Sequence, residues 1–211
     1  RSLMQLTELE FLNLANNSFS GEIPSEIKAL KLQFLKLKSN ELTGCIPPSI
    51  GNLPELAMLD LSFNQLEGRI PESLGRLRKL RGLLLGTNKL SGQIPDSLSK
   101  LRHLSFFTVH DNDLSGSLPP IKLNNQCKVS PERWDRPQFS LPCWGNWTLM
   151  MLHGNRLSCP LPASISWNNE DIRLRGTIAL GNFFNSGSDG KKPDWVSAEL
   201  GDELQLINAE V

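Results

Sequence analysis

The sequence of 211 residues lacks several features that mark particular classes of protein. Neither sign of charge is in excess, with 22 Lys and Arg against 22 Asp and Glu, so the composition shows no electrostatic footprint for nucleic acid or an anionic membrane. No apolar run approaches the length of a transmembrane helix. Only four cysteines occur, and because none has a CxxC partner, a structural zinc site is not expected.

What the sequence has instead is a phrase that recurs at a fixed interval. It reads NELTGCIP in one copy and NQLEGRIP in the next. The six copies begin at the asparagines Asn17, Asn40, Asn64, Asn88, Asn112 and Asn155. The first four steps are 23 or 24 residues long, a period typical of solenoids, and the last step of 43 residues holds one repeat plus 19 inserted residues.

Each repeat predicts one short strand. Leu59 and Leu61 alternate with Asp60 and Ser62, which is the periodicity of a strand with one buried face. One such strand cannot close a core, but stacked copies form a parallel sheet with the leucines inside and the alternating residues on the concave face. The repeated asparagines would then stack in register, and their amides would satisfy backbone groups where the chain leaves the sheet.

The pattern LxxLxxLxLxxNxLxGxIP resembles the plant-type leucine-rich repeat over residues 1–120 and again over 144–165. That subclass forms the ectodomains of plant receptor kinases and receptor-like proteins, and the polygalacturonase-inhibiting proteins. The resemblance implies an α/β-type solenoid in the form of an arc. Its parallel β-sheet would line the concave face, its convex side would be irregular or 3-10 helical, and a second short strand would lie around Ser-Gly-x-Ile-Pro. It also implies an extracellular or secretory, lumenal location.

We expect four segments along the chain. Residues 1–120 hold repeats one to five, 121–143 an inserted loop, 144–166 the sixth repeat and 167–211 an atypical C-terminal cap over the last core edge. Because residue 1 opens directly on repeat-like sequence, we expect a fragment or a mature piece of a longer protein. The insertion is a second candidate for ligand binding, since long irregular insertions in compact folds are often functional.

The cysteines and two sequons predict covalent features. Cys127 and Cys143 bracket the insertion, and a disulfide between them would stabilise the fold by roughly 3 kcal/mol; Cys159 is an alternative partner for Cys143. Cys45 lies several repeats away, so we predict that it is a free, accessible thiol. The glycosylation candidates are Asn16 and Asn146.

The outward positions along the predicted strands form the candidate binding surface. Its residues are Lys36, Lys38, Asp60, Ser62, Phe63, Leu84, Thr108, His110 and His153. Lys36 and Lys38 beside Asp60 predict a charged patch for an acidic or mixed-charge partner. The shallow stretch from Leu84 to Gly86 would leave room for a ligand side chain. The preceding outward position, two residues earlier in each strand, forms an apolar row. We interpret this row as packing beside the strands, with a binding ridge as the alternative; it comprises Phe11, Phe34, Met58, Gly82, Phe106 and Leu149.

The sequence predicts no enzyme. No glycine-rich phosphate loop precedes a helix, and no nucleophile motif appears. His110 and His153, with Asp111 and Asp113 nearby, would allow a metal or catalytic site, but we interpret them as part of a mildly basic surface. We therefore predict no cofactor and no metal.

Two classes of function remain. The first is a recognition module that presents the concave face to a protein, peptide or glycan. The second is a structural or accessory subunit docked permanently in a larger, membrane-associated assembly beside neighbouring subunits. Neither class involves nucleic acid or a membrane span within this chain.

Overall fold

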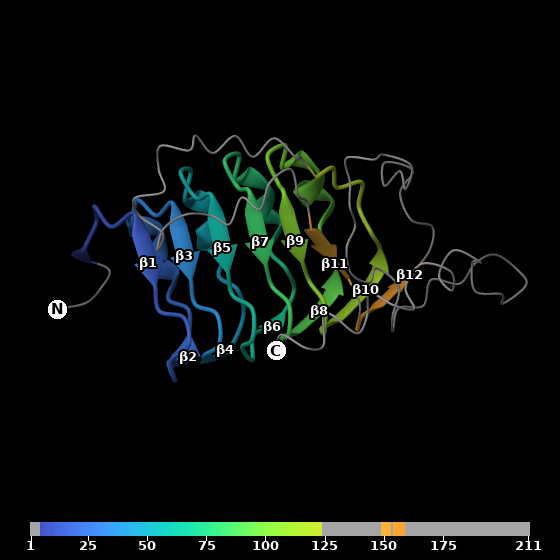
Figure 1. The fold of residues 1–211 in the computed structure, drawn as a ribbon, viewed down its shortest axis with the longest axis horizontal. Helices are drawn as coiled ribbons and strands as arrows, with labels where there is room; N and C mark the ends of the chain where they lie inside the picture. The colour runs from blue at the N-terminus through green and yellow to red at the C-terminus, as the bar shows by residue number, and fades with distance from the viewer. Residues whose placement is uncertain (1–4, 124–148, 153, 159–211) are drawn as a thin grey trace, which may run out of the picture.

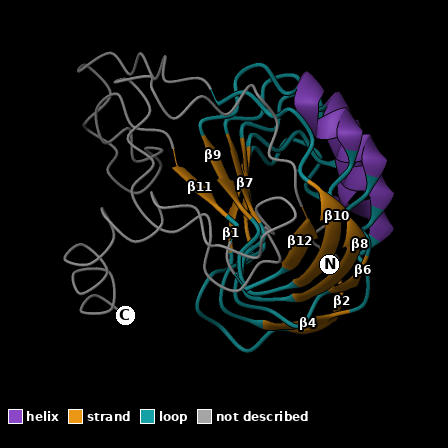
Figure 2. Cartoon of the chain, turned by 90° about the vertical axis from the view of Figure 1, so that its right-hand side faces the viewer, coloured by secondary structure: helices purple, strands orange, loops and turns teal. Residues whose placement is uncertain are grey.

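The computed structural model describes residues 5–123, 149–152 and 154–158, over which the chain coils through six successive repeats (Figure 1). Each turn of the coil has three sides, which Figure 2 shows in an end-on view: one long sheet, a second row of short strands, and a stack of short helices. Within the described ranges no helix is long and apolar enough to cross a membrane.

The long sheet is the predicted parallel sheet of the concave face. Its strands are β1 (Phe11–Asn13), β3 (Phe34–Lys36), β5 (Met58–Asp60), β7 (Gly82–Leu84), β9 (Phe106–Thr108) and β11 (Leu149–Met151). They lie side by side in that order, and every neighbouring pair is parallel. The pairing joins equivalent positions of successive repeats, so the 24-residue period of the sequence is also the register of the sheet.

The other two sides confirm the second strand and the 3-10 convex side. The second row consists of β2 (Ser20–Glu22), β4 (Glu41–Thr43), β6 (Glu67–Gly68), β8 (Lys89–Gln93), β10 (Asp113–Ser117) and β12 (Arg156–Ser158). The 3-10 helices are η2 (Ser25–Ala29), η3 (Pro48–Asn52), η4 (Glu72–Arg76) and η5 (Asp96–Lys100). Each helix follows a proline with extended backbone, such as Pro71 at φ −68° and ψ 134°, because the ring fixes φ and ends the strand pairing.

The core is a column of leucine and isoleucine side chains enclosed by the three sides. Leu59, Leu61, Leu66 and Leu74, all from one repeat, are 0% exposed, and the same positions are buried in the neighbouring repeats. No repeat could bury this set alone, so the stacking that hides the leucines is also what makes each strand stable.

The predicted asparagine ladder is present and makes the hydrogen bonds expected of it. The amide nitrogen of Asn64 donates to the carbonyl oxygens of Leu37 at 2.9 Å and Leu61 at 3.1 Å. The backbone N–H of Leu42 donates to the Asn64 carbonyl oxygen at 3.1 Å. One side chain therefore ties its own repeat to the preceding one at the point where the chain turns away from the long sheet.

The interruption after the fifth repeat does not interrupt the sheet. β11 pairs directly with β9, with Met151 opposite Thr108, and the N–H of Leu114 donates to the side-chain oxygen Oδ1 of Asn155 at 3.1 Å. Repeats five and six are therefore adjacent in the sheet, as the spacing predicts. Most of the predicted insertion 121–143, the Cys127–Cys143 bridge, the sequon at Asn146 and the cap 167–211 lie outside the described residues.

Candidate recognition surface on the concave face

The residues chosen from the sequence as a surface do fall on one face of the long sheet. Lys36 pairs in register with Asp60, Asp60 with Leu84, and Leu84 with Thr108. These residues alternate with the buried leucines and so point away from the core. We call this face the concave surface. His153, predicted to continue it beside His110, lies outside the described residues.

The predicted charged patch is only partly present. Asp60 is 7% exposed, and its carboxylate accepts hydrogen bonds from the hydroxyl of Ser62 at 2.6 Å and from the Ser62 N–H at 3.1 Å. Asn13 has the same position in the first repeat, and its carbonyl oxygen accepts from the N–H of Ala15 at 3.1 Å. A local turn therefore uses the Asp60 carboxylate, which leaves the two lysines as the accessible part of the predicted patch.

The predicted shallow space at Leu84 and Gly86 is filled. A Cβ atom built on Gly86 would overlap the imidazole ring of His110, so this ring lies over the glycine. Thr108 and Ser62, predicted as accessible contacts, are 4% and 5% exposed. Gly86 therefore accommodates the His110 ring of the same protein. The prediction that the stretch from Leu84 to Gly86 leaves room for a ligand side chain is wrong.

The apolar row beside the polar positions behaves as packing. The rings of Phe11 and Phe34 stack with their centroids 4.8 Å apart. Met58 is 3% exposed, and its thioether lies over Gly82 of the next repeat. The interpretation that this row packs along the strands is confirmed for Met58, which covers Gly82, and for the stacked ring of Phe34, whereas Phe11 is 36% exposed.

One accessible pair stands out on the concave surface. Lys38 is exposed, and its ammonium group lies 5.1 Å from the centroid of the Phe63 ring, the geometry of a cation–π contact. Phe63 is 42% exposed. The two residues come from adjacent repeats, at the border where the chain leaves the long sheet, as the hydrogen bond from the Ser39 N–H to the Ser62 carbonyl oxygen at 3.0 Å shows.

Phe63 also adopts an unusual backbone conformation, which sequence reasoning missed. Its φ is +55°, in the left-handed region that bulky L-residues avoid. The residue before the ladder asparagine is left-handed in all six described repeats. Gly154 has this position in the sixth repeat, and the other four non-glycine residues are Asn16, Ser39, Thr87 and Asp111. These four are polar, whereas Phe63 is large and apolar. A comparison of this single column of the repeats would have identified Phe63 as the exception.

The remaining predicted features have a mixed outcome. Cys45 is a free, exposed cysteine, as predicted. Asn16 is exposed, as a glycosylation acceptor must be. In the part of the chain that the structure describes, no three His, Cys, Asp or Glu side chains gather as a metal site.

The family model described as Leucine Rich Repeat matches residues 8–30, 31–53, 55–77 and 79–101. A chain in the BIR3–SERK2 complex from Arabidopsis thaliana is 36% identical, with a TM-score of 0.53, and the match covers 72% of this chain and 70% of that one. The chain belongs to the plant-type leucine-rich-repeat proteins. Its ladder asparagines, left-handed glycines and 3-10 helices are thus those of leucine-rich repeats.

Two further solved structures show how widely this fold is used. The ectodomain of the Arabidopsis thaliana receptor kinase GASSHO1/SCHENGEN3, in complex with CASPARIAN STRIP INTEGRITY FACTOR 2, is 36% identical with a TM-score of 0.62. That match covers 76% of this leucine-rich-repeat chain but 17% of the ectodomain. A plant ice-binding protein is 30% identical with a TM-score of 0.57, and the match covers 74% of this chain and 52% of that one. No curated protein sequence matches this chain significantly.

Proposed function

We propose that this chain is a non-catalytic recognition module that binds an extended peptide or protein segment on its concave surface, with Lys38 and Phe63 as the central contacts. The observation that carries the proposal is Phe63, an exposed aromatic side chain held in a backbone conformation that disfavours it. Backbone strain at an exposed residue is a reason to look for function, because folding alone would select against it.

The energetic cost at Phe63 is appreciable. The left-handed conformation costs an L-residue roughly 1–2 kcal/mol, and asparagine lowers that cost by hydrogen bonding locally. An exposed cation–π contact with Lys38 returns only about 0.5–1 kcal/mol. The fold would therefore be more stable with Asn at position 63, as at Asn16 in the first repeat. A binding role explains why a phenylalanine stands there, since aromatic side chains are frequent anchors of interfaces.

The neighbours of Phe63 indicate the chemistry of the partner. Lys38 is exposed and Lys36 is half-buried, and neither forms an ion pair within the described residues. Asp60 is the nearest acid in the strand register, and its carboxylate already accepts a hydrogen bond from the Ser62 hydroxyl. A segment that places an apolar side chain on the Phe63 ring and an acidic group near the two lysines would complement this part of the concave surface.

The solved structures support a recognition role. The GASSHO1/SCHENGEN3 ectodomain was crystallised with CASPARIAN STRIP INTEGRITY FACTOR 2, and BIR3 and SERK2 form a complex with each other. By analogy we place this chain outside the cell, as part of a receptor-like protein.

A selection of short displayed peptides on the unmodified chain would supply ligands for the test. We expect Lys36→Glu with Lys38→Glu to slow association with these peptides, more so at low salt, and to leave the melting temperature nearly unchanged, because exposed charges steer encounter. We expect Phe63→Asn to speed dissociation. The matched control is Thr87→Asn, which introduces asparagine at the left-handed position of the next repeat.

The insertion provides the competing outcome. If binding survives the double lysine change and Phe63→Asn but is lost when residues 127–143 are deleted, the concave surface is not the site. If catalytic turnover of a selected peptide is detected, the non-catalytic assignment fails.

A further inference from the structure

A second surface lies on the side of the 3-10 helices, away from the concave sheet. Between η4 and η5 the surface encloses a hollow of about 260 Å³. Its lining residues are Glu72, Ser73, Gly75, Arg76, Arg78, Ser97 and Lys100. Two adjacent repeats contribute to it, and no apolar side chain takes part.

The two helices beside the hollow approach each other closely at a glycine. A Cβ atom on Gly75 would lie 2.6 Å from the Cβ of Ser97 in η5, closer than two such atoms can come. The hydroxyl of Ser97 donates to the carbonyl oxygen of Glu72 at 2.8 Å, and that of Ser73 donates to the carbonyl oxygen of Pro48 at 2.7 Å. The floor is therefore bare backbone, and the protons of both hydroxyls are used within the fold.

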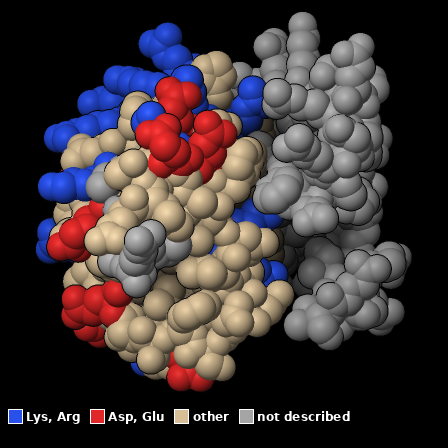
Figure 3. Space-filling view, turned by 90° about the vertical axis from the view of Figure 1, so that its left-hand side faces the viewer, with Lys and Arg blue, Asp and Glu red and all other residues tan. Residues whose placement is uncertain are grey.

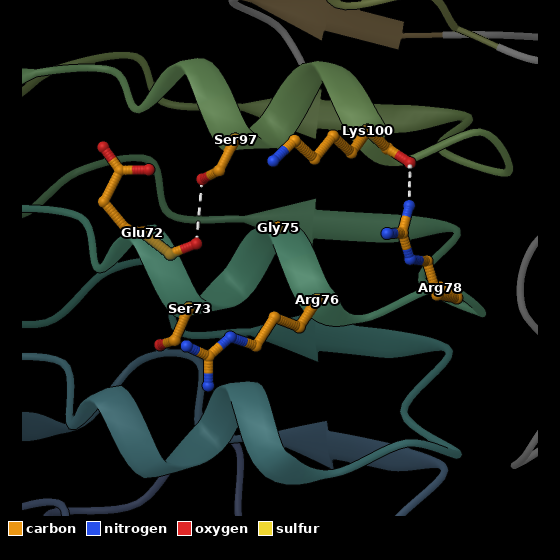
Figure 4. Close-up of a pocket in the computed structure, with 7 residues that line it drawn as sticks. All are labelled: Glu72, Ser73, Gly75, Arg76, Arg78, Ser97 and Lys100. Atoms are coloured by element: carbon orange, nitrogen blue, oxygen red, sulfur yellow. Dashed lines mark hydrogen bonds between the residues drawn. The ribbon is translucent and has the colours of Figure 1, made fainter.

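Three cations surround this floor. In Figure 4 these cations lie on different sides of Gly75: the Lys100 ammonium group is beside Ser97, the Arg78 guanidinium group is beside the Lys100 carbonyl oxygen, and the Arg76 side chain extends toward Ser73. Within the described residues none of the three pairs with a carboxylate, although Arg78 donates to the Lys100 carbonyl oxygen at 3.3 Å. The carboxylate of Glu72 is drawn pointing away from Gly75 (Figure 4). The positive charge at the hollow is thus left available for an anion.

The cations also repeat along the solenoid. Lys100 stands 24 residues after Arg76, and Arg102 stands 24 residues after Arg78, so each pair occupies equivalent positions in adjacent repeats. Figure 3 shows a row of Lys and Arg side chains along one edge of the molecule, with groups of Asp and Glu beside it.

We propose that this flank binds an anionic polysaccharide, with Arg76, Arg78 and Lys100 as the contacts of one acidic group and its neighbour along the polymer. A peptide would be expected to use an apolar anchor, and the lining offers none. A polymer of hydroxyl-rich sugars with one negative group on each unit matches a polar lining and cations at equivalent positions of two adjacent repeats. The proposal is independent of the ligand of the concave surface.

The test measures binding of the 211-residue chain to immobilised alginate, which carries one carboxylate on each sugar, and to its neutral propylene glycol ester. We expect binding to alginate only, weakening as salt is raised. The variant Arg76→Gln with Arg78→Gln and Lys100→Gln should bind on the order of tenfold more weakly at low salt, since three exposed charge contacts are lost. If the triple variant does not fold, the double variant Arg76→Gln with Lys100→Gln is used in its place, because it keeps the hydrogen bond donated by Arg78.

The matched control removes the same amount of charge elsewhere, with Lys31→Gln, Lys89→Gln and Lys122→Gln. None of these lysines lines the hollow, and we expect nearly unchanged binding. Equal losses in the two triple variants would show that only net charge matters and would overturn the site. Competition by polyglutamate as strong as that by free alginate would show that the partner is an acidic protein segment. Absence of binding to alginate by the unmodified chain would overturn the proposal outright.

Discussion

At the scale of single residues, the ladder asparagines carry a large share of the order in this fold. The Asn64 side chain makes four hydrogen bonds with backbone groups, three as donor and one as acceptor. Asn17, the first copy, is exposed, and among the described residues it donates only to Leu14 and Ala15 of its own repeat. The same residue in the same phrase thus stabilises the fold to different degrees, according to whether a preceding repeat lies beside it.

This difference predicts an asymmetry between two identical substitutions. Asn64→Ala leaves the N–H of Leu42 and several carbonyl oxygens without their partner, so we expect a loss of about 2–4 kcal/mol in the free energy of unfolding. Asn17→Ala should cost less than about 1 kcal/mol, because the groups that it contacts are open to water. Urea denaturation of both variants measures the difference. Equal losses would mean that the bonds between repeats contribute little.

The backbone at Phe63 predicts a gain of stability. Because asparagine tolerates φ near +55°, Phe63→Asn should raise the free energy of unfolding by about 1 kcal/mol. The control is Phe63→Leu, which keeps a bulky residue in the left-handed region and should give no such gain. Thermal denaturation of the two variants decides the matter. If both variants raise the melting temperature equally, the cause is the removal of an exposed aromatic ring and not the relief of backbone strain.

The residue scale is also where the sequence is least informative. The repeated phrase predicts which positions point outward, because strand alternation follows from backbone geometry alone. It does not predict that Ser62 occupies the Asp60 carboxylate or that the His110 ring covers Gly86. Those contacts depend on which rotamers neighbouring side chains adopt once the register brings them together. The period of the sequence contains no information about that choice.

At the scale of elements, the 3-10 helices pack more closely than their sequence suggests. A Cβ atom at Gly51 in η3 would lie 2.6 Å from the carbonyl carbon of Ser73 in η4, and Gly75 meets Ser97 of η5 in the same way. Neither glycine has a left-handed φ, so the neighbouring helix and not the turn requires the missing side chain. The repeated motif predicts the strands and the prolines that end them. It does not predict the spacing of the helices, which depends on the curvature of the stacked repeats.

Adding one methyl group at this contact should therefore be costly. We expect Gly51→Ala to lower the free energy of unfolding by about 1–3 kcal/mol, because η3 and η4 must move apart to accept it. Asn52→Ala changes the next residue of the same helix, which is exposed, and should have little effect. Circular dichroism during urea denaturation compares the two. A Gly51→Ala protein as stable as the unmodified chain would show that the helices have room to separate.

At the scale of the whole molecule, the strands and 3-10 helices of the described residues pack against their counterparts in adjacent repeats. The six strands of the long sheet pair only in the order of the repeats, so the sheet has one end at β1. In the 211-residue chain that end is the least enclosed part of the described fold, with Leu6 54% exposed, Phe11 36% and Phe19 47%. The counterparts of Leu6 and Phe19 in the third repeat are buried, with Leu53 1% exposed and Leu66 0%.

A gradient of local stability follows from this geometry. In a solenoid, stability is a sum of terms within repeats and between neighbours, so a repeat with one neighbour opens more readily than a repeat with two. We expect amide hydrogen exchange to be fastest in residues 5–23 and slowest in 55–101, where repeats lie on both sides. Exchange measured by mass spectrometry on peptic fragments gives the profile. Asn64→Ala provides an internal check, because it should accelerate exchange in the middle repeats first. Uniform protection from residue 5 onward would contradict the nearest-neighbour account and would require contacts that span several repeats.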